Sequence, residues 1–179
     1  MANNSSYREI EAKILDINLD EVKNKLRELN AVCEREIDLE QVVWWIRDKT
    51  TSLRVRKSSD SKIRLTMKEK VKDGWGYNEW ETDISEYEKT IAIIDNLIPE
   101  PELRMAFSHH REDWLLDGVG ICLDTIPKIN PFLEIEAESE ERVKEIATKL
   151  GLNPNDLIDQ GMMQIILERL NLKPGRITL

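Results

Sequence analysis

Charged and apolar residues alternate in several segments of the chain, and this alternation is its strongest pattern. In YREIEAKIL, residues 7–15, Glu9, Glu11 and Lys13 stand at every second position, with apolar residues between them. In a β-strand such a pattern places the charges on one face and the apolar side chains on the other. The same alternation recurs in LRVRK (53–57), KIRLTMKEK (62–70), YNEWETDI (77–84) and FLEIEAES (132–139).

The periodicity predicts a mixture of strands and helices. Strands are expected at 7–15, 40–47, 52–58, 62–72, 76–84, 103–116, 119–126 and 131–138. Helices are expected at 20–30, 86–98, 139–150 and 154–170. The predicted fold class is therefore α+β. No repeat or linker interrupts the pattern, so we expect a single domain over residues 1–179.

Two architectures explain strands that carry one charged face. In an open sheet, the charged faces meet solvent and the apolar faces lie under helices. In a closed barrel, helices cover the apolar faces from outside, and the charges line the lumen. Periodicity alone does not choose between them.

The distribution of charge narrows the chemistry. The chain has a formal net charge of −9, which argues against general nucleic-acid binding. Residues 47–72 nevertheless hold ten Lys and Arg against three acids, while the acids gather toward the C-terminal half. A basic and an acidic segment within one small domain indicate a polyanion bound together with a cation.

Further features bear on the location of the protein. No run of 18 apolar residues occurs, so we expect no membrane span and no membrane partner. The N-terminus has no apolar signal region. Cys33 and Cys122 are far apart in the sequence, so we expect reduced thiols and a cytoplasmic protein.

The order of the charged motifs resembles a known family. Glu9-Ile-Glu11-Ala-Lys13 resembles the ExExK signature of the CYTH superfamily, the triphosphate tunnel metalloenzymes. This superfamily includes class IV adenylyl cyclases, thiamine triphosphatases and inorganic tripolyphosphatases. The similarity continues through further motifs in the family's order: Arg54 and Arg56 in LRVRK, Lys68 in LTMK, Glu81, Arg111 and Trp114 in HHREDW, and Asp124 before Glu134 and Glu136.

The resemblance implies a closed eight-stranded antiparallel β-barrel, with helices outside, that binds a triphosphate with Mg²⁺ or Mn²⁺. Arginine forks match phosphate oxygens, and magnesium prefers hard oxygen ligands. By resemblance, the metal-site candidates are Glu9, Glu11, Asp124, Glu134 and Glu136. The phosphate-site candidates are Lys13, Arg54, Arg56, Lys68, Arg111 and His109. The catalytic candidates are Lys13, Glu11 and Arg111.

The chain departs from the family pattern at two positions that matter for chemistry. His109 stands where the family often has Lys, and a histidine binds phosphate strongly only when protonated. Asp38-Leu39-Glu40 stands where a tyrosine-containing run is common. In some tripolyphosphatases that tyrosine partners the motif lysine, so hydrolysis by this arrangement is in question here.

Three functions remain open from the sequence. The first is a metal-dependent triphosphatase, and the second is a class IV adenylyl cyclase that converts ATP to cyclic AMP and pyrophosphate. The third is a non-catalytic tunnel that binds a nucleotide or polyphosphate. In each case the expected partner is a small-molecule triphosphate, and a homodimer is left open.

Overall fold

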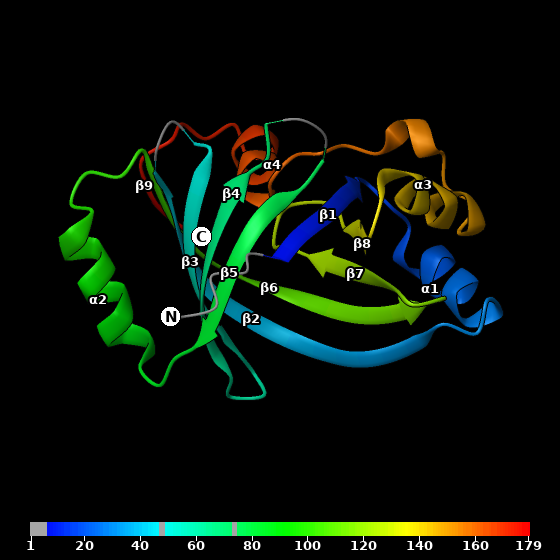
Figure 1. Cartoon of the computed structure of the whole chain (residues 1–179), viewed down its shortest axis with the longest axis horizontal. Coiled ribbons are helices and arrows are strands. Elements are labelled where there is room, and N and C mark those ends of the chain that lie inside the picture. Colours follow the sequence, from blue (N-terminus) through cyan, green and yellow to red (C-terminus); the bar gives the residue numbers. More distant parts are fainter. Residues whose placement is uncertain (1–6, 47–48, 73–74) are drawn as a thin grey trace. The chain divides into compact units, whose positions relative to one another are not determined.

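The computed structural model describes residues 7–46, 49–72 and 75–179, and it is an α+β fold (Figure 1). In these ranges the strands are β1 (Tyr7–Ile14), β2 (Val32–Ile46), β3 (Thr51–Ser58), β4 (Ile63–Lys70), β5 (Tyr77–Asp83), β6 (Leu103–Leu116), β7 (Val119–Thr125), β8 (Phe132–Ala137) and β9 (Arg176–Thr178). The helices are α1 (Leu19–Glu28), α2 (Tyr87–Leu97), α3 (Glu140–Lys149), the 3-10 helix η1 (Pro154–Asp156) and α4 (Met162–Arg169).

The chain divides into two compact units. Besides the start of the chain, the first unit contains Leu39–Ser108 and Lys173–Leu179. The second unit contains Glu9–Asp38 and His109–Leu172. The long strands β2 and β6 contribute residues to both units.

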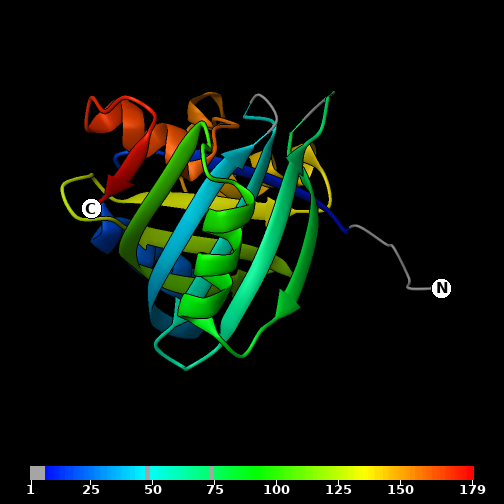
Figure 2. The same ribbon diagram turned by 90° about the vertical axis from the view of Figure 1, so that its left-hand side faces the viewer.

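An antiparallel ladder of β2, β3, β4 and β5 forms the first unit. Its apolar face packs against α2, which crosses the strands in Figure 2. The buried cluster there consists of Val42, Trp44, Val55, Tyr87 and Ile94. The alternating charged residues of β3 and β4 therefore occupy the face that α2 does not cover.

The second unit contains the antiparallel ladder β1–β8–β7–β6. Helix α3 begins after Ser139, whose hydroxyl accepts a hydrogen bond from the Arg142 amide, and it packs against β8. Leu133 and Ile135 of β8 are fully buried. Glu134 and Glu136 project from the opposite face of the strand, because alternate side chains point to opposite sides.

The predicted helix at 154–170 was wrong in its first half. Only η1 and α4 are helical, and Leu157 has extended backbone angles between them. Ile158 pairs with Lys13 through two backbone hydrogen bonds of 2.9 Å. Gly161, a poor residue for a helix interior, is instead the N-cap of α4. Pairing with β1 thus overrides the apolar periodicity of this segment.

Other differences concern strand length. The predicted strand at 40–47 begins earlier, at Val32, and the short strand β9 was not predicted. β9 pairs in parallel with the start of β6.

None of the helices in the described ranges is both long and apolar enough to span a membrane. Cys33 and Cys122 are both free thiols.

Candidate functional site

A buried lysine connects two acids in the second unit. Lys13 and Glu134 lie directly opposite each other on β1 and β8. The Lys13 Nζ is 2.7 Å from Glu134 Oε2 and 2.7 Å from Glu11 Oε1, and the lysine side chain is only 2% exposed. Burial alone would lower the pKa of Lys13, but the two carboxylates outweigh it and raise the pKa above its ordinary value. Lys13 is therefore a fixed cation.

Arg111 and Asp124 form a second buried pair, between β6 and β7. The guanidinium donates two hydrogen bonds, of 2.8 and 2.7 Å, to the two oxygens of Asp124. His109 Nε2 lies 3.3 Å from the same carboxylate. Burial would raise the pKa of Asp124, but Arg111 and His109 hold it well below its ordinary value. Asp124 is thus a permanent anion in a fully buried position.

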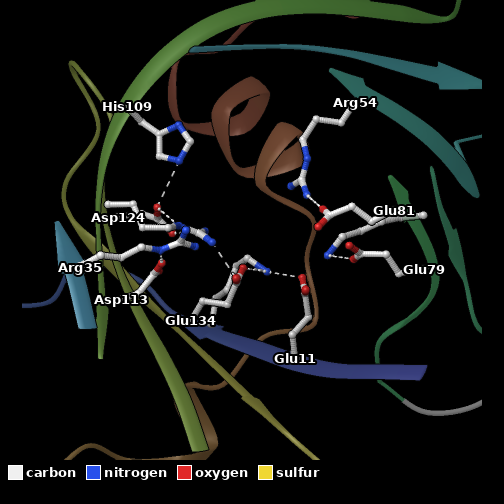
Figure 3. A network of polar contacts seen from close by, with 12 residues as sticks. Glu11, Arg35, Arg54, Glu79, Glu81, His109, Asp113, Asp124 and Glu134 are labelled. Carbon is white, nitrogen blue, oxygen red and sulfur yellow. Dashed lines mark hydrogen bonds and ion pairs between the residues drawn. The ribbon is translucent and has the colours of Figure 1, made fainter. Parts of the chain in front are cut away.

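These pairs join into one chain of polar contacts within the second unit. Arg111 Nη2 also lies 3.4 Å from Glu134 Oε1, which links the arginine pair to the lysine. Figure 3 shows that this series of contacts runs from His109 through Asp124 and Glu134 to Glu11. The six predicted site residues that it brings together are Glu11, Lys13, His109, Arg111, Asp124 and Glu134.

Two glutamates face each other at one end of this chain of contacts. Glu11 of β1 lies directly opposite Glu136 of β8, and both share the strand face of Lys13 and Glu134. Like charges directly opposite in a ladder destabilise it unless a cation lies close by. Glu9, the remaining metal-site candidate, lies in β1, but its side chain is outside the described residues.

Arg54 of the first unit lies in a row with Thr66 and Glu81 across β3, β4 and β5. The buried Thr66 hydroxyl donates a hydrogen bond of 2.9 Å to Glu81 and accepts one of 3.4 Å from Arg54 Nη2. Arg54 Nη2 is 3.9 Å from Glu81. The Arg54 Nε is buried and has no hydrogen-bond partner within the described ranges.

Two arginines face each other in the next row of the same ladder. Arg56 of β3 lies directly opposite Arg64 of β4. Arg64 also pairs with Glu81, at 2.8 Å, and Asp83, at 3.3 Å. On the other side of the Arg54 row, Lys68 pairs with Glu79 at 3.0 Å, and the Lys68 side chain is only 17% exposed. The side chains of Arg64 and Lys68 are thus only partly exposed to solvent.

The sequence reading missed some members of these charged faces. Arg35 of β2 forms an ion pair with Asp113 of β6, and both lie in the second unit. Asp113 alternates with His109 and Arg111, so strand periodicity alone could have identified it. Arg35 lies before the strand predicted at 40–47, so the predicted alternation does not extend to it. Glu79 lies in the alternating segment YNEWETDI but was not a predicted site residue.

The donor set of the second unit fits a hard divalent cation. Glu11, Glu134, Glu136 and Asp124 carry carboxylate oxygens, the ligand type that such a cation prefers. Lys13 contacts Glu11 and Glu134, and Arg111 contacts Asp124, so these cations would have to give up part of their contacts to a metal. Elsewhere in the described part of this unit, Glu36, His110 and Glu112 have ligand atoms within 4.8 Å of one another. None of these three was a predicted metal ligand.

Comparison with known proteins identifies the family. A CYTH domain matches residues 7–162, which is most of the chain. The chain belongs to the CYTH family. The family membership that the sequence of this CYTH protein implied by resemblance is thus confirmed. No functionally curated protein matches the chain.

Solved structures share the fold of this CYTH protein. A conserved hypothetical protein from Pyrococcus furiosus is 25% identical, with a TM-score of 0.77, and the match covers 88% of this chain and 99% of that one. A candidate adenylate cyclase from Vibrio parahaemolyticus is 17% identical, with a TM-score of 0.73 and coverage of 90% and 99%. A candidate adenylyl cyclase from Hippeastrum with a dominant triphosphatase activity is 15% identical, with a TM-score of 0.58 and coverage of 92% and 96%.

Proposed function

We propose that this CYTH protein is a metal-dependent enzyme that binds a triphosphate and hydrolyses it. The observation that supports the proposal is the occurrence of a like-charge pair in each unit. Arg56 opposes Arg64 on one charged face, and Glu11 opposes Glu136 on the other. Part of this charge is already balanced, because Arg64 pairs with Glu81 and Asp83, and Glu11 pairs with Lys13. A bound polyanion would add negative charge beside the arginines, and a bound dication would add positive charge beside the glutamates, as expected for a metal–triphosphate complex.

The proposed architecture is the closed eight-stranded barrel of the family, formed by one domain over residues 1–179. In such a barrel both charged faces line the tunnel, and the helices lie outside. The position of α2 against the apolar face of the first unit is consistent with this arrangement. The limited exposure of Lys68 and Arg54, at 17% and 22% of their side chains, is also consistent with it.

The proposed roles follow the chemistry of each side chain. The phosphate ligands are Lys13, Arg54, Arg56, Lys68, Arg111 and, when protonated, His109. The residues that would hold Mg²⁺ or Mn²⁺ are Glu9, Glu11, Asp124, Glu134 and Glu136. The bound dication would neutralise phosphate charge and polarise the bond that breaks. The cationic side chains would orient the triphosphate and stabilise the negative charge that develops in the transition state.

Lys13 and Arg111 are assigned as positively charged catalytic groups and not as bases. The carboxylates around Lys13 raise its pKa, so it does not lose its proton at neutral pH. Its ammonium can exchange part of its contact with Glu11 and Glu134 for a phosphate oxygen when a triphosphate binds. Glu11 then becomes available to a metal ion or to the proton of an attacking water molecule, which is its proposed catalytic role.

Cyclisation is the second candidate. The Vibrio parahaemolyticus protein is a candidate adenylate cyclase, whereas triphosphatase activity dominates in the Hippeastrum protein. Both reactions use the same phosphate and metal ligands, and they differ in which phosphorus is attacked and by which oxygen. A third candidate, a non-catalytic tunnel, would bind the same ligand without turnover.

Product analysis tests the proposal. The purified protein is incubated with ATP, tripolyphosphate or thiamine triphosphate and Mg²⁺ or Mn²⁺, and the products are resolved by chromatography. We expect release of inorganic phosphate that EDTA abolishes. Cyclic AMP and pyrophosphate from ATP would instead identify a cyclase. Tight binding of a triphosphate without any product would identify the non-catalytic tunnel.

A further inference from the structure

Glu36, His110 and Glu112 form a cluster of metal-ligating groups outside the charged faces described above. Glu36 comes from β2, and the other two come from β6. One ligand atom from each lies within 4.8 Å of those of the other two. On β6, His110 and Glu112 alternate with Arg111, so they lie on the opposite side of the strand from the proposed triphosphate ligands.

The two ring nitrogens of His110 each lie close to a carboxylate. Its Nδ1 is 2.9 Å from Asp38 Oδ1, and its Nε2 is 3.2 Å from Glu36 Oε1. When Nδ1–H donates to Asp38, Nε2 carries the lone pair that a metal needs. A carboxylate behind a ligating histidine fixes its tautomer and its ring orientation. The Asp38–His110 contact supplies this arrangement.

Glu112 is the fixed member of the cluster. It is only 7% exposed, and its Oε2 accepts a hydrogen bond of 3.2 Å from Trp114 Nε1. Its other oxygen forms an ion pair with Lys23 of α1. The carboxylates also create a negative local field. The carboxylates of Glu36, Asp38 and Glu112 face one ammonium, that of Lys23.

We propose that Glu36, His110 and Glu112 bind a transition-metal dication such as Zn²⁺, with Asp38 as the partner that orients His110. One imidazole nitrogen and two carboxylates form a mixed nitrogen–oxygen donor set that suits Zn²⁺, whereas Mg²⁺ prefers oxygen ligands only. The site joins β2 to β6 and is independent of the metal that a triphosphate would bring. Zn²⁺ bound there would stabilise the second unit.

Nuclear magnetic resonance tests the site directly, because the chain contains only two histidines. The full chain, with ¹⁵N-labelled histidine, is titrated with Zn²⁺ at pH 8 in excess Mg²⁺, which saturates hard oxygen sites. We expect the His110 Nε2 resonance to shift and to saturate at one equivalent of Zn²⁺. A His109→Gln variant assigns the remaining histidine signals. Signals of His110 that do not move would overturn the proposal.

Matched variants on β2 provide the control. Glu36→Gln is expected to weaken Zn²⁺ binding at least tenfold, and the Glu36 side chain is 66% exposed, so the fold should tolerate the change. Asp38→Asn should weaken binding about 10- to 100-fold through loss of the orienting contact. Glu34→Gln, an exposed change on the same strand face, should leave binding unchanged. Equal weakening by Glu34→Gln and Glu36→Gln would contradict a specific site. Triphosphate turnover in Mg²⁺ should be the same in Glu36→Gln and wild type, which separates this proposal from the proposed function.

Discussion

Lys13 and Glu134 face each other across β1 and β8, and their charged atoms are 2.7 Å apart in a buried position. The same ammonium contacts Glu11 at 2.7 Å, so its single positive charge is shared between two carboxylates. Lys13, a proposed phosphate ligand, thus contacts two of the proposed metal ligands. Binding of a metal–triphosphate complex would exchange these contacts, with the metal on the acids and phosphate on the lysine.

Removal of the Lys13 charge should destabilise the fold. Lys13→Met removes the buried ammonium that contacts Glu11 and Glu134, and breaking a buried ion pair on one side costs about 3–5 kcal/mol. Denaturant unfolding at neutral pH in EDTA measures this cost. Lys25→Met is the control, because the Lys25–Glu28 pair is exposed and contributes less than about 1 kcal/mol. Equal stabilities of the two variants would argue against a buried ion-pair network.

The Arg111–Asp124 pair should contribute stability that depends on pH. The pKa of Asp124 is lower in the folded chain than its ordinary value of 3.8. Its contribution is therefore fully present above about pH 5 and is lost as the pH falls below about 4 toward the folded-state pKa. The stability difference between wild type and Asp124→Asn should narrow in this range. Unfolding curves in EDTA from pH 7 to pH 2.5 measure it, and a constant difference would refute the linkage.

Metal-dependent turnover should require the carboxylate of Glu136. Glu136→Gln should keep the fold, as judged by circular dichroism, but lose most of the metal-dependent turnover, since one carboxylate of the opposed Glu11–Glu136 pair is gone. Glu138→Gln is the matched control, because Glu138 is exposed and lies beyond the end of β8. Full activity in a folded Glu136→Gln protein would remove this residue from the metal site.

Substitutions on the two faces of the basic strand β3 test which face binds phosphate. Arg54→Ala and Arg56→Ala should each lower kcat/KM by about 100-fold, since one preorganised charge contact contributes about 3 kcal/mol to transition-state stabilisation. Lys57 is exposed and projects from the opposite face of the same strand, so Lys57→Ala should resemble wild type. If Arg56→Ala and Lys57→Ala behave alike in steady-state kinetics, the phosphate assignment of β3 is wrong.

Much of the candidate site could be predicted from sequence, because alternation fixes the face of each side chain once the strand is known. Glu11, Lys13 and Glu134 were selected by motif order, and the structure brings their charged atoms into contact. The specific pairings could not be predicted, since they depend on register between strands that are far apart in the chain. Lys13 meets Glu134 only because β1 pairs with β8 in one register.

The errors have equally local causes. The segment around Ile158 has apolar spacing that suits a helix, but its backbone pairs with Lys13 as an extended strand would. Arg35 was missed because its strand was predicted to begin at residue 40 and begins at Val32. The Glu36–His110–Glu112 cluster joins two strands that are far apart in sequence, so no motif spacing could indicate it.

The central claim is that a triphosphate binds with a divalent metal at the charged network around Lys13. Calorimetric titration with a non-hydrolysable triphosphate tests it most directly, on wild type, Lys13→Arg and Lys13→Met, each shown to be folded under the assay conditions. We expect metal-dependent binding to wild type, weaker binding to Lys13→Arg, which keeps the charge with a different donor geometry, and no binding to Lys13→Met. Undiminished binding by folded Lys13→Met, or equal binding by wild type with and without metal, would contradict the claim.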